Sequence, residues 1–127
     1  DDAVIAEDGS HLTSNWAKRY KYYPKNKPEN LNRFIHDSLA VGLNPLDGHA
    51  ACAAYVIEDQ VEKILSEVLI LAPSDDPFAF PQADKFLTGL KNAKGISKEV
   101  IQGGMIPLME EKHQEVSKLV LEFLRKR

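Results

Sequence analysis

Residues 48–71, GHAACAAYVIEDQVEKILSEVLIL, decide the fold that the sequence predicts. Apolar residues recur along this stretch at alternating steps of four and three: Ala50, Ala54, Ile57, Val61, Ile64, Val68 and Leu71. This heptad spacing is typical of a helix that packs against a neighbour along one seam. Asp47 can cap the start and Pro73 follows the end, so we predict one long central helix over about 48–71.

The seam of this helix has small residues in its first half and bulky ones in its second half. We favour packing inside an antiparallel bundle, because a helix in a small domain usually packs on its own chain. Pairing of the 50–71 helix with a second copy of the chain, which would give a homodimer, stays open.

The rest of the chain is divided by proline and glycine into amphipathic segments. We expect further helices at about 13–23, 28–42, 83–95, 97–103 and 107–127. No stretch shows clean alternation of apolar and polar residues, so the predicted fold is all-α, a compact bundle of about five to six helices. We expect residues 1–12 to form a flexible acidic tail and residues 13–127 a single helical domain.

Composition narrows the classes of function. The net charge of −3 gives no general attraction to phosphate backbones. No apolar run approaches the ~20 residues that span a bilayer, so we expect no membrane partner. The single cysteine, Cys52, can form neither an internal disulfide nor a cysteine-based metal site, which suggests a cytoplasmic or other reducing intracellular location.

A basic and aromatic stretch, NWAKRYKYYPKNKPENLNRF at 15–34, is one candidate binding surface. Its cations could neutralise phosphates and its tyrosines could stack on unpaired bases, which makes nucleic-acid binding through residues 16–33 an alternative function. The cations concerned are Lys18, Arg19, Lys21, Lys25, Lys27 and Arg33. Helical spacing instead buries Trp16, Tyr20 and Tyr23, and leaves Lys18, Arg19, Lys21 and Tyr22 as a solvated face or a protein-binding patch.

The proline-bounded segment DDPFAFP, residues 75–81, is the second candidate. If exposed, Phe78 and Phe80 are natural anchors for a protein interface. If buried, they fold back over the end of the bundle. The favoured function is a non-enzymatic helical protein-interaction or regulatory module, with another protein as its partner.

Three histidines, His36, His49 and His113, leave a small enzyme or a metal site as a second alternative. Glu110 and His113 have the spacing used by carboxylate-bridged di-metal bundles, but those sites need a second such pair, which this sequence lacks. We therefore assign no catalytic residue and expect no metal or cofactor. Residues 99–127 resemble, in part, one armadillo-type repeat. Because a solenoid needs about three repeats and no other copy occurs, we assign no family.

Overall fold

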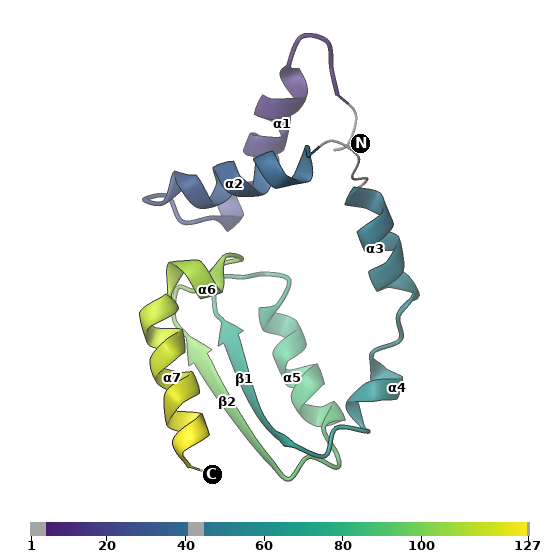
Figure 1. Ribbon diagram of the computed structural model, residues 1–127, viewed down its shortest axis with the longest axis vertical. Coiled ribbons are helices and arrows are strands. Elements are labelled where there is room, and N and C mark those ends of the chain that lie inside the picture. The colour runs from purple at the N-terminus through teal and green to yellow at the C-terminus, as the bar shows by residue number, and fades with distance from the viewer. Residues whose placement is uncertain (1–4, 41–44, 127) are drawn as a thin grey trace. The chain divides into compact units, whose positions relative to one another are not determined.

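The computed structural model describes residues 5–40 and 45–126. This part of the chain contains seven α-helices, one short 3-10 helix and a sheet of two parallel strands (Figure 1). The fold is therefore mixed α/β, and the prediction of an all-α helical bundle is wrong. The chain divides into an amino-terminal unit, Asp1–Tyr55, and a carboxyl-terminal unit, Val56–Arg127. A single domain over 13–127 stays a prediction.

The long central helix predicted over about 48–71 does not exist. The stretch instead contributes to three elements: α3 (Pro45–Ala54), α4 (Glu58–Val61) and β1 (Glu67–Pro73). The run VLILA at 68–72 has the length and bulk of a strand, and short apolar runs fit a helix or a strand equally well on spacing alone. Without one continuous helix, the basis for a homodimer seam over 50–71 is gone.

The amino-terminal unit contains α1 (Ser10–Arg19), the 3-10 helix η1 (Tyr20–Tyr22), α2 (Pro28–Ser38) and α3. Its core consists of buried and half-buried side chains from α1, η1, α2 and the residues beside them: Trp16, Tyr22, Tyr23, Leu31, Ile35 and Leu39. Before α1, the Ser10 backbone N–H donates to Asp8 Oδ1 (3.0 Å), and this bond lowers the pKa of the Asp8 carboxyl. The first helix thus begins inside the segment 1–12 that the sequence assigns to a tail.

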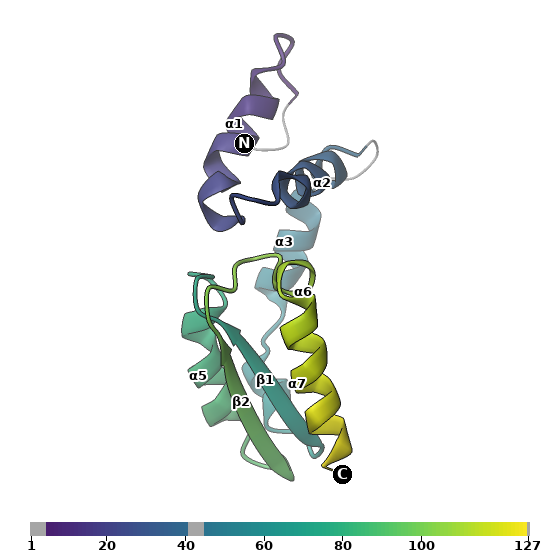
Figure 2. The same cartoon turned by 90° about the vertical axis from the view of Figure 1, so that its left-hand side faces the viewer.

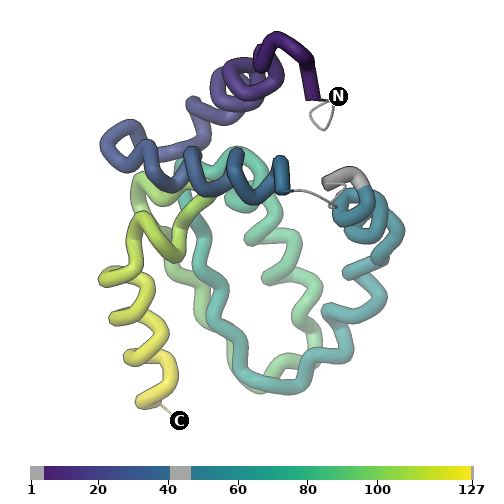
Figure 3. Tube along the Cα trace, turned by 45° about the horizontal axis from the view of Figure 1, so that its top comes forward, coloured from purple at the N-terminus to yellow at the C-terminus, as the bar shows by residue number. Residues whose placement is uncertain are grey.

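The carboxyl-terminal unit is built on β1 and β2 (Gly95–Ile101), which pair in parallel from Glu67↔Gly95 to Pro73↔Ile101. The connection between them runs through α5 (Phe80–Gly89), as Figure 3 traces. Two further helices, α6 (Leu108–Glu111) and α7 (His113–Arg125), follow β2.

The two longest helices of this unit cover opposite faces of the strand pair (Figures 1 and 2). On the α5 face, the Lys98 ammonium of β2 pairs with Asp84. On the α7 face, Phe123 lines a small hollow together with Leu69 and Ser97 of the strands. The buried core is apolar and draws on all the larger elements: Val61, Ala72, Ala83, Leu90, Ile101 and Val116.

The short helix predicted at 97–103 is wrong, because residues 95–101 form β2. Ser97 resembles a helix cap in the sequence, but the backbone of this segment pairs with β1, whose residues lie 28 positions earlier along the chain. The last predicted helix, starting at Pro107, is divided at Lys112 into α6 and α7.

Gly104 lies where the loop after β2 passes close to other segments. A Cβ atom there would lie 2.7 Å from Leu108 Cδ1 and 3.2 Å from the Ile101 carbonyl oxygen. We expect Gly104→Ala to lower the free energy of unfolding by about 1–3 kcal/mol, because the backbone must shift to admit the methyl group. Gly95→Ala is the matched control, since its nearest new contact would be Glu67 Cγ at 3.7 Å. Urea denaturation giving equal free energies for both variants would contradict this close approach.

Candidate functional site

The carboxyl ends of β1 and β2 meet at one edge of the sheet, where the loops that follow them are joined by hydrogen bonds. The Ser74 backbone N–H donates to the Ile101 carbonyl (3.1 Å), and the Asp75 N–H donates to the Gly104 carbonyl (2.9 Å). The Ser74 hydroxyl oxygen accepts from the Gly103 N–H (2.8 Å). In open α/β sheets, ligands bind beside the carboxyl ends of the parallel strands. Residues 74–80 are called the strand-end turn from here on.

A buried carboxylate fixes the strand-end turn. Asp76 is 7% exposed, and its Oδ1 accepts hydrogen bonds from the backbone N–H groups of Phe78 (2.8 Å) and Ala79 (2.9 Å). Its carbonyl oxygen accepts from the Phe80 N–H (3.1 Å). An aspartate that bonds the backbone two residues on is a characteristic turn former. The chain therefore enters α5 along a path held by three hydrogen bonds to one residue.

The two phenylalanines of this turn remain in contact with solvent. Phe78 is 58% exposed and Phe80 is 37% exposed. The interpretation in which both rings fold back into a core is therefore not what the structure has. Asp75, next to them, is also exposed, and its Oδ1 accepts a hydrogen bond from the Ser74 hydroxyl (2.7 Å). The turn thus presents two aromatic rings beside one carboxylate.

The basic and aromatic stretch lies in the amino-terminal unit, and several of its cations cover its own rings. Lys25 Nζ lies 3.5 Å from the centroid of the Tyr20 ring, and Lys21 Nζ lies 4.8 Å from that of Tyr22. Arg19 stacks over Phe34 at 5.1 Å, and its guanidinium also donates to Asn15 Oδ1 (2.8 Å).

The remaining cations of this stretch, Lys18, Lys27 and Arg33, have interactions of their own. Tyr23 is buried, as the helical spacing predicts, whereas Trp16 is half-buried and Tyr20 is 43% exposed.

The three candidate histidines are exposed and have only weak local contacts. His36 Nδ1 lies 3.4 Å from Asp37 Oδ1, and His113 Nδ1 lies 3.3 Å from the Glu110 carbonyl oxygen. His49 and Cys52 are both exposed on α3. Among the residues that the structure describes, no group of three or more His, Cys, Asp or Glu side chains could hold a metal ion.

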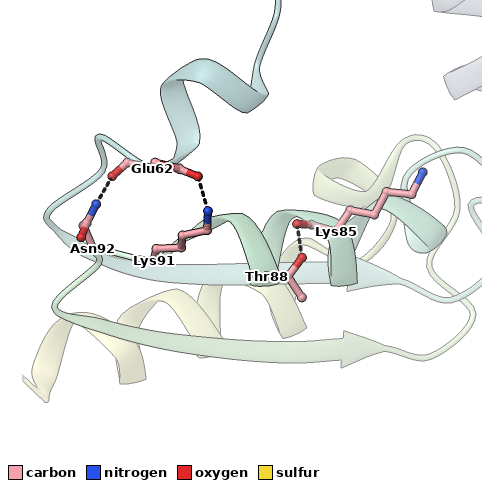
Figure 4. Close-up of polar contacts among 5 residues, drawn as sticks. All are labelled: Glu62, Lys85, Thr88, Lys91 and Asn92. Carbon is pink, nitrogen blue, oxygen red and sulfur yellow. Dashed lines mark hydrogen bonds and ion pairs between the residues drawn. The ribbon is translucent and has the colours of Figure 1, made fainter.

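A second feature of the carboxyl-terminal unit, separate from the strand-end turn, was missed from the sequence: a cavity of about 510 Å³ between α4 and α5. Beside it, the Lys91 ammonium forms an ion pair with Glu62, and Asn92 Nδ2 donates to the Glu62 carbonyl oxygen (2.7 Å; Figure 4). These contacts join residues 29 and 30 positions apart, so no local pattern indicates them. The only sequence signal is Gly89, which allows two elements to approach closely.

Comparison with known proteins gives no match: no protein family, curated protein or solved structure is significantly similar to this chain. Within residues 5–40 and 45–126, no helix is both long enough and apolar enough to cross a membrane. A proposal about function therefore depends on the geometry of the carboxyl-terminal unit itself.

Proposed function

We propose that this chain is a non-enzymatic protein-interaction module, and that its carboxyl-terminal unit binds another protein through the strand-end turn. The observation that carries the proposal is the exposure of Phe78 and Phe80 on a turn fixed by a buried carboxylate. A few side chains supply most of the binding energy at protein interfaces, and aromatic residues that enter pockets on a partner are frequent among them. Two such rings on an ordered backbone segment are suited to this role.

The rigidity of the turn supports the same proposal. Binding requires the interface residues to become ordered, and a segment that is already ordered loses less entropy on binding. The backbone of Phe78 and Phe80 is held by Asp76 in the free chain, so little additional ordering is needed. The exposed carboxylate of Asp75 beside the rings favours a partner surface with an apolar pocket and a cation at its edge.

We expect the double variant Phe78→Ala/Phe80→Ala to weaken partner binding by at least about thirtyfold, because truncating an aromatic anchor removes a large share of the binding energy. The free energy of unfolding should fall by no more than about 1–1.5 kcal/mol, because both rings are partly exposed and neither belongs to the buried core. Quantitative affinity capture from source cells, followed by calorimetric titration with the captured partner, measures the first effect. Urea denaturation measures the second.

The matched control is Leu121→Ala/Leu124→Ala, which truncates two exposed apolar residues of the same unit on α7 (51% and 49% exposed). This variant should capture the partner as the unmodified chain does. Equal capture by both double variants would contradict the proposal. A loss of several kcal/mol in stability for the phenylalanine variant would show that the two rings belong to the core.

Nucleic-acid binding through residues 16–33 stays a prediction from the sequence. The stacking of Lys21 and Lys25 on the rings of Tyr22 and Tyr20 does not favour it, because these rings would have to leave their cations in order to stack on bases. No specific contact in the described residues favours the alternative that uses His36, His49 and His113.

A further inference from the structure

The cavity between α4 and α5 lies wholly within the carboxyl-terminal unit and is distinct from the strand-end turn. Its volume of about 510 Å³ falls in the range of pockets that bind small molecules, roughly 300–1,000 Å³. Apolar side chains form much of its lining, chiefly Ile57, Val61 and Phe86. Charged and polar groups stand around them, which is the usual arrangement of a site for an amphipathic ligand.

The walls of the cavity are fixed by packing as well as by polar contacts. Val61 is 5% exposed and fits against Gly89, where a Cβ atom would come within 2.8 Å of Val61 Cγ1. The ion pair of Glu62 with Lys91 and the hydrogen bond from Asn92 tie the end of α4 to the segment after α5 (Figure 4). The short helix α4 is thus held in place against α5, and the space between them is part of the folded unit.

The polar groups of the lining differ in whether they are already satisfied. The Thr88 hydroxyl donates to the Lys85 carbonyl (2.8 Å), and Lys91 and Glu62 neutralise each other. The Lys85 side chain extends away from that ion pair (Figure 4). Its ammonium has no partner among the described residues. The carboxylate of Glu58, also in the lining, is likewise unpaired among these residues.

We propose that this cavity binds a small molecule that combines an aromatic or branched apolar body with an anionic group. The apolar body lies against Ile57, Val61 and Phe86, and the anionic group pairs with the Lys85 ammonium. The Glu58 carboxylate lines the same cavity and repels an anion there. Removing the Lys85 charge should therefore weaken binding of the anion, and removing the Glu58 charge should strengthen it. A small molecule is large enough to fill a cavity of this size by itself.

The test uses the full chain and two fluorescent probes that share the same rings. One is 1-anilinonaphthalene-8-sulfonate, which carries an anionic group, and the other is N-phenyl-1-naphthylamine, which carries none. We expect the sulfonate to bind saturably at one site with a Kd on the order of 10–100 µM. Lys85→Gln should weaken sulfonate binding by about two- to fivefold, the usual effect of one exposed charge pair, and leave binding of the neutral probe unchanged.

Three further variants complete the test. Glu58→Gln should strengthen sulfonate binding by about two- to fivefold and leave the neutral probe unaffected. Ile57→Glu replaces a residue of the lining that is 45% exposed and should weaken both probes. Phe78→Ala/Phe80→Ala should bind both probes as the unmodified chain does, which separates this site from the proposed protein interface.

Three results of the probe titrations would overturn the proposal: sulfonate binding that does not saturate, equal sulfonate affinity in the unmodified chain and Lys85→Gln, or unchanged binding of both probes by Ile57→Glu. A further measurement uses only the unmodified chain, so the proposal can be tested even if a variant does not fold. In ¹⁵N–¹H spectra of the unmodified chain, the sulfonate should shift the amide signals of Thr88 and Gly89. Shifts confined to other segments would also overturn the proposal.

Discussion

Replacement of Ile101 by alanine is expected to lower the free energy of unfolding of the carboxyl-terminal unit by about 2–5 kcal/mol. Ile101 is fully buried (0% exposed) at the end of β2, opposite Pro73 of β1. Removing three carbons from this position takes apolar surface out of the core and leaves a cavity. The backbone carbonyl of Ile101, which accepts hydrogen bonds from Ser74 and Gly104, is not changed by the substitution.

Ile96→Ala on the same strand is the matched control. Ile96 is 39% exposed, so its truncation should cost less than about 1 kcal/mol. Both variants replace isoleucine by alanine within β2, and the difference in intrinsic strand preference therefore largely cancels between them. Urea denaturation followed by circular dichroism measures both free energies. Equal losses for the two variants would contradict the position of Ile101 in the core.

The sequence predicts helices well where one apolar face is sufficient to define them. Pro28 marks the start of α2 as expected, and amphipathic stripes indicate α5 and the long part of the last helix. These elements depend on neighbours three and four residues away, which a local pattern contains.

The two strands could not be predicted in this way, because their hydrogen bonds join distant segments. The run VLILA at 68–72 continues the heptad of the preceding residues, yet its backbone groups pair with residues 96–100. Ser97 likewise resembles a helix cap when only its sequence neighbours are considered, yet it pairs with Leu69 of β1. A parallel pair has no short hairpin turn between its strands, so the sequence between β1 and β2 gives no direct signal of the pairing.

The candidate site was only partly visible in the sequence. Two prolines beside Phe78 and Phe80 indicate a turn, and the structure places both rings in contact with solvent. The sequence does not distinguish Asp75 from Asp76 as the residue that fixes the turn. That role depends on the direction in which the Asp76 side chain points, which only the structure shows. The cavity beside α5 depends on a contact between Glu62 and Lys91, which only the fold brings together.

Replacement of Asp76 by alanine is the second change with a large expected effect, because it acts on stability and on the proposed function together. The Asp76 carboxylate accepts two backbone hydrogen bonds, from Phe78 and Ala79, at a position that is 7% exposed. Its removal leaves both N–H groups without this acceptor, and hydrogen bonds to a charged group contribute more than neutral ones. We expect the free energy of unfolding to fall by about 2–4 kcal/mol.

The effect of Asp76→Ala on binding distinguishes a rigid interface from two merely exposed rings. Phe78 and Phe80 are unchanged in this variant, but the backbone that positions them is released, so partner binding should fall by at least about tenfold. Asp76→Asn keeps an oxygen that can accept both hydrogen bonds and should retain most of the stability and the binding. Asp75→Ala, at the exposed neighbour, should leave stability nearly unchanged.

Calorimetric titration with the captured partner and urea denaturation, applied to the three aspartate variants, separate the two contributions. If Asp76→Ala remains folded at low temperature and binds as tightly as the unmodified chain, the rings alone are sufficient and order in the turn contributes nothing. If it binds weakly while Asp76→Asn binds normally, the loss comes from the missing acceptor and not from the missing charge. The buried carboxylate would then be a positioning residue, because it acts on the partner only through the backbone of the two phenylalanines.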